Sequence, residues 1–401
     1  MEEMFSVIPS GGVTSPKGFC AGAVAARIKH KVSGALDLGV LSAGKPVPVA
    51  ALFTTNKVAA APVIVSRQRV AAGHAAGIVV NSGCANASAG EKQIEDAEHM
   101  AALAAQHLGI SPQDMLVAST GVIGQRLPMD RITEGIPRIA CKSDGGHDFA
   151  RAIMTTDTVS KEVAVDTGQF VIGGCAKGSG MIHPDMATML VFLTTDASVD
   201  PGFLKESLQS VADGSFNMLS IDGDTSTNDM AVIFASGEAG GDMITSESPR
   251  AELFQRALQS VCVHLTRALA RDGEGATRRI EVIVRGAASH GDARKAARTI
   301  VSSALVKSAV HGADPNWGRV LAAAGRSGIE MVPEKVYLEM GGICLVEHGC
   351  PVPFEREKVS DYLHNDEVMI VLNLNIGNGE AAAWGCDLSR EYVTINADYT
   401  T

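Results

Sequence analysis

The chain has 401 residues, of which 46% are hydrophobic and 20% are charged, and its formal net charge is −11. This composition supports a sizeable core and argues against global disorder. The acidic balance argues against a nucleic-acid partner, because a nucleic-acid-binding protein would carry a basic face.

The termini, apolar runs and cysteines suggest a compartment. The chain has no uninterrupted run of 18 apolar residues, so we expect no membrane span. The first residues, Met1-Glu2-Glu3-Met4, are acidic, unlike a secretory or mitochondrial leader. Eight cysteines are scattered without a Cys-x-x-Cys pair, and we expect them to be reduced, mostly buried thiols. Together these features predict a cytoplasmic protein.

The first half of the chain alternates apolar runs with glycine-rich turns. Residues 76–80 and 116–120 are predicted to be buried strands. Between them, apolar residues recur every three or four positions over 94–108, which predicts an amphipathic helix. Ser88 and Glu91 have the spacing of a capping box at the start of that helix.

The second half predicts further strands and two more helices. The helices are expected to begin at Pro201 and Pro249, because proline is favoured in the first turn. Strands are predicted over 162–175, 189–195, 280–284 and 368–376. Strands and helices intermingle without a long linker, so the pattern predicts an α/β fold with no obvious domain boundary.

Several apparent ligand motifs fail on their own chemistry. The segment from Gly39 to Lys45 imitates a phosphate-binding loop, but Pro46 stands where a Ser or Thr is needed. Residues 222–233 imitate a calcium loop but lack its central glycine and terminal glutamate. The eleven histidines show no paired ligand spacing. We therefore expect no metal and no cofactor.

The most unusual segment is KGSGMIHPDMATML at 177–190. It fits a glycine-rich turn that leads into a strand, in which Thr188 is an ordinary β-branched residue. It also fits a catalytic segment: if the bond before Thr188 is cut, the threonine hydroxyl becomes a nucleophile with its own α-amine as the base. An α-amine has a pKa of roughly 7.7–8, which suits proton transfer near neutral pH.

Two other short segments allow either a structural or a functional interpretation, and a third indicates only a structural one. Thr120 and Gly121 are a strand end, or a hydroxyl and a free N–H that can donate to an oxyanion. Glu274 lies between two glycines in a helix-terminal turn and is either a solvated acid or a ligand group. The C-terminal residues 396–401 have no obvious packing role, which is typical of a frayed tail.

Taken together, these segments resemble the glutamate N-acetyltransferase family, also called ornithine acetyltransferases. The resemblance covers nearly the whole chain. It is carried by GVTSPKGF at 12–19, TTNK at 54–57, NSGCANA at 81–87, STGVIG at 119–124, MTTDT at 154–158, KGSGMIHPDMATML at 177–190, DGDTSTND at 222–229, DGEGAT at 272–277, HGADPNWGR at 311–319, WGCDLS at 384–389 and NADYTT at 396–401.

The resemblance implies a layered α/β fold of the αββα type, shared with related aminopeptidases, and a chain that cuts itself between Ala187 and Thr188. The products would be an α piece, 1–187, with the oxyanion hole and the processing loop, and a β piece, 188–401, that starts with the nucleophile. The pieces would form an α₂β₂ heterotetramer.

The resemblance also implies roles for single residues. Thr188 matches the acetyl-accepting nucleophile, and Thr120 and Gly121 match the oxyanion hole. The implied substrate contacts are Thr155, Lys177, Thr188, Glu274, Asn396 and Thr401. Thr156 adjoins Thr155 and is the alternative position for that contact.

The implied reaction is a ping-pong transfer in arginine biosynthesis. N²-acetylornithine gives its acetyl group to Thr188 and ornithine leaves, after which glutamate takes the acetyl group and becomes N-acetylglutamate. A pocket that holds both Lys177 and Glu274 would suit two substrates whose side chains differ in the sign of their charge. The sequence leaves open whether acetyl-CoA is a second donor.

Two other functions are consistent with the residues. One is a self-processed N-terminal-threonine amidase or aminopeptidase, in which water replaces glutamate as the acceptor. The other is a non-catalytic amino-acid-binding or scaffold protein whose chain is never cut.

Overall fold

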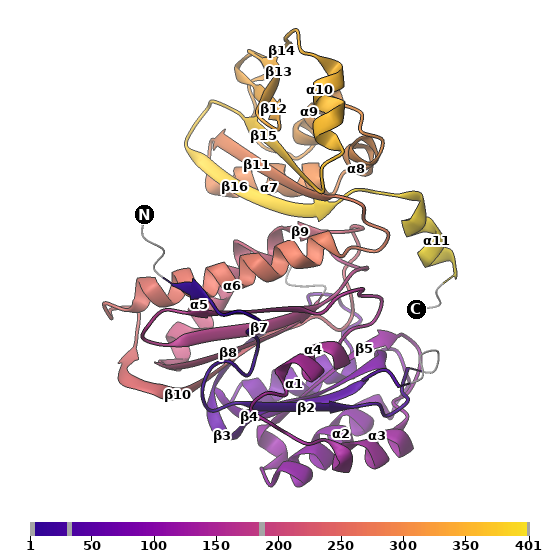
Figure 1. Ribbon diagram of the computed structural model, residues 1–401, viewed down its shortest axis with the longest axis vertical. Coiled ribbons are helices and arrows are strands. Elements are labelled where there is room, and N and C mark those ends of the chain that lie inside the picture. Colours follow the sequence, from indigo (N-terminus) through magenta and orange to yellow (C-terminus); the bar gives the residue numbers. More distant parts are fainter. Residues whose placement is uncertain (1–4, 30–33, 184–188, 399–401) are drawn as a thin grey trace.

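The structure is a computed structural model that describes residues 5–29, 34–183 and 189–398. It contains two β-sheets, one of nine strands and one of seven, with helices packed against both (Figure 1). The mixture of strands and helices confirms the predicted α/β class.

The nine-stranded sheet folds back on itself along one long strand. That strand, β3 (Leu38–Phe53), changes register between Ser42 and Val47 and divides the sheet into two facing layers. One layer holds β2 (Cys20–Val24), the first part of β3, β4 (His74–Cys84) and β5 (Met115–Val122). The other holds the end of β3, β10 (Met230–Ile244), β8 (Leu190–Val199), β7 (Val171–Lys177), β6 (Lys161–Asp166) and β1 (Ser6–Val7).

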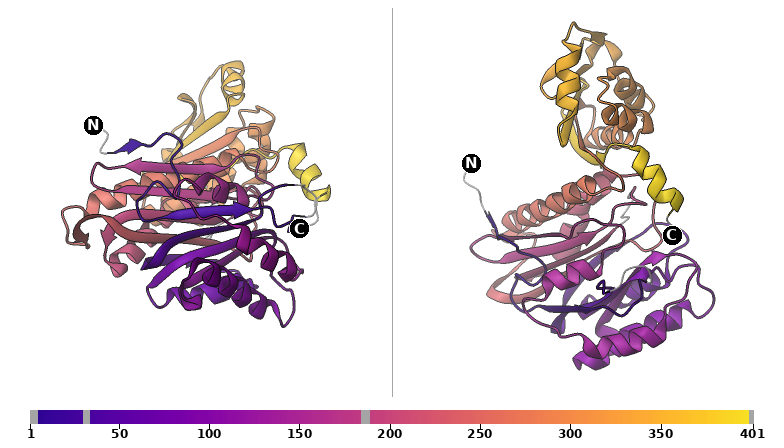
Figure 2. Two further views of the ribbon diagram at one scale, coloured as in Figure 1. Left: turned by 60° about the horizontal axis from the view of Figure 1, so that its bottom comes forward. Right: turned by 45° about the vertical axis from the view of Figure 1, so that its right-hand side comes forward.

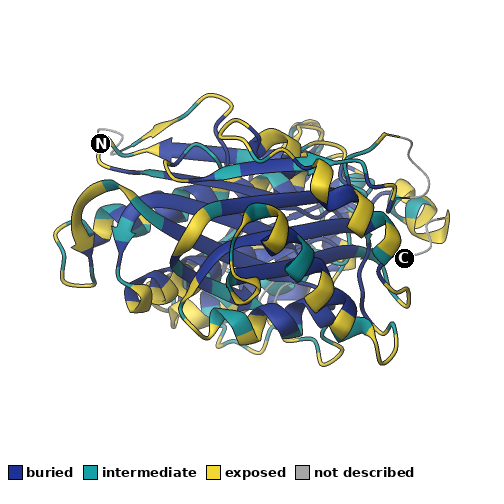
Figure 3. Ribbon diagram, turned by 90° about the horizontal axis from the view of Figure 1, so that it is seen from below, coloured by how far each residue is buried: buried dark blue, intermediate teal, exposed yellow. Residues whose placement is uncertain are grey.

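Both layers are buried on both faces, and their side chains alternate between two cores. In β5, Leu116 and Ala118 point into the core between the layers, whereas Met115 and Val117 point outward under helices. In β10, Val232 points into the same central core. This alternation of period two follows from the pleat of a strand. Figure 3 shows the buried strands beneath helices whose outer faces are exposed.

Helices cover the outer face of each layer. On one side lie α1 (Ala61–Val70), α2 (Gln93–Leu108) and α3 (Met129–Gly135), and on the other lie α5 (Pro201–Asp213) and α6 (Ala251–Arg271). The short helix α4 (Gly146–Ala152) contributes Phe149 to the central core, where it meets Phe192 edge to face with ring centroids 5.1 Å apart. The order helix, sheet, sheet, helix confirms the αββα architecture that the resemblance implied (Figure 2).

The seven-stranded sheet forms the remainder of the fold. Its strands, in spatial order, are β14 (Cys350–Pro351), β13 (Ile343–Glu347), β12 (Tyr337–Met340), β15 (Glu367–Asn373), β11 (Arg279–Ala287), β16 (Gly379–Cys386) and β9 (Leu219–Ser220). It packs with α7 (His290–Val301), α8 (Ala304–His311), α9 (Trp317–Gly325) and α10 (Arg356–Leu363). Short 3₁₀ turns lie at Pro112–Asp114, Ile136–Arg138, Phe216–Met218 and Pro333–Lys335. The last helix, α11 (Arg390–Asp398), leaves this sheet and runs back toward the first one (Figure 1).

Several predicted elements are confirmed, and three boundaries are corrected. The predicted strand at 162–175 is two strands, because Gly168, at a φ of 76°, lies in a tight turn between them. The strand predicted over 368–376 ends at Asn373, and Asn375 has a φ of 52°. The capping box is wrong: α2 begins at Gln93, and Ser88 has a φ of 50° outside the helix.

The predicted boundary before residue 188 falls inside the nine-stranded sheet. Strand β8, which follows that boundary, pairs with β7, which precedes it. Strand β10 also follows the boundary and pairs with β3. The segments 1–187 and 188–401 therefore interleave in one sheet rather than forming separate units.

All eight cysteines are free; four are buried, and the Sγ atoms of Cys20 and Cys141 lie 2.8 Å apart. Within the described ranges, no helix combines the length and apolar character that a bilayer crossing would require.

Candidate active site

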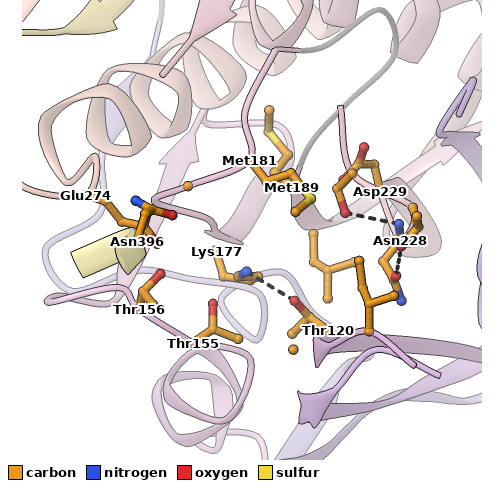
Figure 4. Close-up of a pocket in the computed structure, with 16 residues that line it drawn as sticks. Thr120, Thr155, Thr156, Lys177, Met181, Met189, Asn228, Asp229, Glu274 and Asn396 are labelled. Carbon is orange, nitrogen blue, oxygen red and sulfur yellow. Dashed lines mark hydrogen bonds between the residues drawn. The ribbon is translucent and has the colours of Figure 1, made fainter. Parts of the chain in front are cut away.

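A pocket of about 120 Å³ lies at the ends of β5 and β7 and at the start of β8. Helix α11 lies along one side of it. Figure 4 shows its lining side chains. Six residues that the sequence singled out line it together: Thr120, Gly121, Thr155, Lys177, Glu274 and Asn396. These residues come from five separate segments, so the fold rather than local sequence brings them together.

The end of β5 presents Thr120 and the backbone of Gly121 to the pocket. Gly121 has a φ of 128°, and a Cβ at this position would collide with the backbone of Gly83 on the neighbouring strand β4. Only glycine fits this crossing. The side-chain amide of Asn228 donates to Ser119 O at 2.9 Å, which ties this strand end to the loop before β10.

Lys177 ends β7 and points its ammonium group toward Thr120. The Lys177 Nζ atom donates a hydrogen bond to Thr120 Oγ1 at 3.2 Å. Only 8% of Lys177 is exposed, and burial lowers the pKa of its ammonium group from the ordinary value of lysine. Because Lys177 uses an oxygen lone pair of Thr120, the Thr120 hydroxyl hydrogen stays available to donate to another acceptor.

A buried carboxylate lies behind the lysine. Asp157 Oδ1 accepts from the Gly178 N–H at 2.7 Å and from Lys161 Nζ at 2.6 Å. Burial alone would raise the pKa of Asp157, but the charges of Lys161 and Lys177 outweigh it and hold the pKa at about 2. The ionised Asp157 therefore fixes the turn that follows Lys177.

Thr155 and Thr156 both line the pocket, and their hydroxyls differ in their hydrogen bonds. Thr156 Oγ1 lies 2.6 Å from Ser179 Oγ, so a neighbouring hydroxyl already engages it. Within the described part of the chain, no hydrogen bond involves the Thr155 hydroxyl, while its N–H donates to Asp157 at 2.9 Å. This difference favours Thr155 over Thr156 as the residue that offers a hydroxyl to a ligand.

Glu274 follows α6 and is held by backbone contacts on one side and by α11 on the other. The Glu274 N–H donates to Ser179 O at 2.7 Å. A Cβ on Gly180 would overlap the Glu274 carboxylate, so the carboxylate packs directly on the glycine backbone. The Asn396 side-chain amide donates to Glu274 Oε2 at 2.9 Å. The predicted approach of the C-terminal segment to the site is thus observed for Asn396.

The segments on each side of the predicted cleavage point are anchored. Asp222 accepts hydrogen bonds from the N–H groups of Met181, at 2.5 Å, and Ile182, at 2.9 Å. On the other side, Met189 O accepts from the Met230 N–H at 3.0 Å, and Met189 lines the pocket. Ala187, Thr188 and Thr401 lie outside the described residues.

Part of the lining was not predicted from the sequence, apart from Thr156, which was the alternative to Thr155. Ile123, Thr156, Gly180, Met181, Met189, Leu190, Ser226, Thr227, Asn228 and Asp229 also face the pocket. Residues 226–229 belong to the DGDTSTND segment, which contributes to the family resemblance but carries no predicted contact with the site. The Thr54 hydroxyl donates to Ser226 O at 2.7 Å, and the Asn56 amide donates to Thr225 O at 2.9 Å. The TTNK segment therefore supports this side of the pocket, a role that no local pattern indicates.

No group of three or more His, Cys, Asp or Glu side chains among the described residues is arranged to hold a metal ion.

Comparisons with known proteins identify relatives over the full chain. The sequence profile of the ArgJ family matches residues 20–401. The arginine biosynthesis bifunctional protein ArgJ of Dehalococcoides mccartyi is 51% identical over 405 residues, covering 100% of both chains. The protein of the same name from Symbiobacterium thermophilum is 50% identical, covering 98% of this chain and 99% of the relative. A crystal structure of the Bacillus halodurans arginine biosynthesis bifunctional protein argJ has a TM-score of 0.51 and 46% identity, and covers 52% of this chain and 98% of that one. The family resemblance predicted from the sequence is therefore confirmed, and the chain belongs to the ArgJ family.

Proposed function

We propose that this chain is an acetyltransferase of arginine biosynthesis that moves the acetyl group of N²-acetylornithine to glutamate through an acetyl-Thr188 intermediate. Its membership of the ArgJ family supports the enzyme class and the pathway, because the full-length relatives are named for arginine biosynthesis. The same membership favours transfer over the hydrolytic alternative and over a non-catalytic scaffold.

The observation that carries the substrate assignment is the placement of Lys177 and Glu274 in one small pocket. Donor and acceptor are both α-amino acids with an α-carboxylate, but the ornithine side chain ends in an ammonium group and the glutamate side chain ends in a carboxylate. Glu274 suits the first and Lys177 suits a carboxylate of either substrate. A pocket with both signs of charge accommodates the two substrates in turn.

In the first half-reaction, the α-amine of Thr188 takes the proton of its own hydroxyl, and Oγ1 attacks the acetyl carbonyl carbon. The Thr120 hydroxyl and the Gly121 N–H donate to the oxyanion that forms. The C–N bond then breaks, the proton passes to the leaving amine, and ornithine departs. In the second half-reaction, the α-amine of glutamate attacks the acetyl ester, and the Thr188 hydroxyl is restored.

Self-cleavage between Ala187 and Thr188 would create the required α-amine. The anchors at Ile182 and Met189 would hold both ends of the cut segment. The interleaved strands would keep the two pieces associated, since β7 and β8 pair across the cut. The solved Bacillus halodurans chain aligns over 98% of its own length with 52% of this chain, which is consistent with a relative that exists as two pieces.

The remaining parts of the proposal are an α₂β₂ assembly, a cytoplasmic location, no bound cofactor, and acetyl-CoA as a second acetyl donor. The word bifunctional in the names of the relatives supports the second donor.

Water must be excluded from the acetyl ester, and α11 lies on the side of the pocket where Asn396 contacts Glu274.

The substitution Glu274→Gln tests the substrate assignment. It removes the charge that we assign to the ornithine ammonium group and keeps the size of the side chain. The KM for N²-acetylornithine should rise roughly tenfold, whereas the KM for glutamate should change less than about threefold. Glu391→Gln, an exposed acid on α11 outside the pocket lining, is the control. Equal losses for both substrates would contradict the assignment.

A further inference from the structure

Three buried charged side chains, Asp157, Lys161 and Asp272, form a continuous link outside the lining of the active-site pocket. We call this group the lysine bridge. Lys161 Nζ donates to Asp157 Oδ1 at 2.6 Å and to Asp272 Oδ2 at 2.5 Å. The side chains of Asp157, Lys161 and Asp272 are 0%, 1% and 7% exposed. None of the three is among the described residues that line the pocket, so any effect on the pocket must pass through other residues.

The ammonium group of Lys161 is fully engaged within the protein. It has three hydrogens to donate, and the third acceptor is Val159 O at 3.4 Å. Burying three charged groups costs solvation free energy, and apolar side chains of similar volume often give equal or greater stability. The lysine bridge therefore needs a reason other than ligand binding or stability, and holding two segments in register is the best-attested use of such buried charges.

The Asp157 end of the lysine bridge supports the side of the pocket that carries Thr155 and Lys177. Asp157 Oδ2 accepts from the Thr155 N–H at 2.9 Å. Asp157 Oδ1 accepts from the Gly178 N–H at 2.7 Å, one residue after Lys177. Burial lowers the pKa of Lys177, and the charge of Asp157 opposes that shift. Asp157 thus holds Thr155 in place and supports both the position and the charge of Lys177.

The Asp272 end of the lysine bridge supports the turn that carries Glu274. Asp272 follows α6, and its carboxylate also accepts from the N–H of Thr158, at 3.0 Å, and from the Thr158 hydroxyl. Only Gly273 separates Asp272 from Glu274. A Cβ on Gly273 would lie 2.8 Å from Cys386 Sγ, so the turn is closely packed and has little room to absorb a shift of Asp272.

A second contact joins the same two segments, because the Glu274 N–H donates to Ser179 O at 2.7 Å. One contact alone would leave the turn free to pivot about it, whereas two contacts define the direction in which the Glu274 carboxylate points. The link through Lys161 supplies the second fixed point.

We propose that Lys161 is a positioning residue for acetyl transfer, which sets the spacing between the charges of Lys177 and Glu274. This inference rests on the proposed function, in which those two charges select the substrates. The two ends of the lysine bridge then act differently. The Asp272 end serves Glu274, which faces only the ornithine ammonium group, whereas the Asp157 end serves the side of the pocket that meets both substrates.

The test compares the two ends in separate variants, with every KM measured on fully cleaved enzyme. Asp272→Asn keeps the shape of the side chain and removes the charge that Lys161 holds. It should raise the KM for N²-acetylornithine roughly tenfold and the KM for glutamate less than about twofold. Asp157→Asn should raise both KM values roughly tenfold. Lys161→Met should also raise both, and the two aspartate variants decide the question if Lys161→Met does not fold.

The matched control is Asp96→Asn. The Asp96 side chain is 8% exposed, pairs with Arg126 at 2.7 Å, and lies on α2 outside the pocket lining. Its replacement should lower Tm by an amount similar to that of Asp272→Asn and leave both KM values unchanged. A substrate-dependent change in KM therefore separates positioning from general stability.

A double-mutant cycle tests whether Asp272 acts through Glu274. In a Glu274→Gln background, Asp272→Asn should raise the KM for N²-acetylornithine by less than about twofold more, because the charge that it positions is already absent. A role in stability alone would give the same factor in both backgrounds.

The outcomes separate this inference from the proposed function. If the wild type transfers acetyl groups and Asp272→Asn shifts neither KM, or shifts both equally, the positioning role of Lys161 is wrong and the proposed function stands. Full additivity in the double-mutant cycle would overturn the positioning role as well. A wild-type enzyme that forms no N-acetylglutamate from N²-acetylornithine and glutamate would overturn the proposed function, and this inference with it.

Discussion

The ammonium group of Lys177 donates to the hydroxyl oxygen of Thr120 at 3.2 Å, and both residues are more than nine-tenths buried. The two residues are on β7 and β5, which belong to the two facing layers of the sheet. This contact therefore joins the layers at the pocket, and it orients the Thr120 hydroxyl as a donor. It links the architecture to the chemistry that we propose.

The first prediction concerns that hydroxyl. Thr120→Val keeps the shape of the side chain and removes the donor, so acetyl transfer by the cleaved enzyme should fall about 10²- to 10³-fold in kcat. Thr120→Ser keeps the hydroxyl and should retain activity within about tenfold. The measurement is the steady-state rate of N-acetylglutamate formation per cleaved enzyme. A fully active Thr120→Val enzyme would exclude Thr120 from the oxyanion hole.

The second prediction concerns the close contact between Gly180 and Glu274. Gly180 is not in the left-handed region, so alanine suits its backbone, but the added Cβ would overlap the Glu274 carboxylate. Gly180→Ala should therefore displace the carboxylate and raise the KM for N²-acetylornithine by roughly tenfold or more, with little change in Tm. Gly325→Ala, where the Cβ meets nothing within 4 Å, is the control for the same substitution. An unaffected KM would show that the position of the carboxylate is not critical.

The third prediction concerns the C-terminal helix. Asn396→Ala removes the hydrogen bond to Glu274 Oε2, so the carboxylate loses a positioning partner. The KM for N²-acetylornithine should rise roughly fivefold, because the contact is exposed and a hydrogen bond to a charged group is partly replaced by water. Thr394→Ala, on the same exposed helix, should have no effect. If both variants behave like the wild type, the helix does not contribute to binding.

The fourth prediction concerns stability and pH. The pKa of Asp157 is about 2 in the folded chain and 3.8 for the unperturbed group, and this difference corresponds to about 2 kcal/mol. Because the folded value is the lower one, this stabilisation is complete above about pH 4 and is lost as the pH falls toward 2. Asp157→Asn should therefore lower Tm clearly at pH 7 and much less near pH 2. Asp148→Asn, an exposed acid on α4, is the control. A Tm difference that does not depend on pH would contradict the ionised state of Asp157.

Much of the fold could be predicted from local pattern. The short apolar runs at 76–80 and 116–120 correctly indicated buried strands, because side chains on both faces of each strand enter apolar cores. The caps were less predictable. Ser88 and Glu91 have the correct spacing, but Ser88 adopts a left-handed conformation and the Ala89 N–H donates to the Gln93 side chain instead.

The site could be predicted only where the sequence carries an unusual motif. The described residues to which the resemblance assigned a role all reach one pocket, but no local pattern indicated what Asn228 and Asp222 contact. The Asn228 amide bridges Ser119 and Ala85, and Asp222 holds Met181 and Ile182. Both sets of contacts join residues that are at least 40 positions apart in the chain. Such contacts depend on the tertiary fold and leave no periodicity in the sequence.

Self-cleavage and acetylation of Thr188 can both be measured in an intact-mass spectrum of the purified protein before and after incubation with N²-acetylornithine. We predict two fragments that separate before Thr188, and a gain of one acetyl group on the C-terminal fragment that disappears when glutamate is added. A single full-length mass that never gains an acetyl group would contradict both the self-cleavage and the acetyl-Thr188 intermediate.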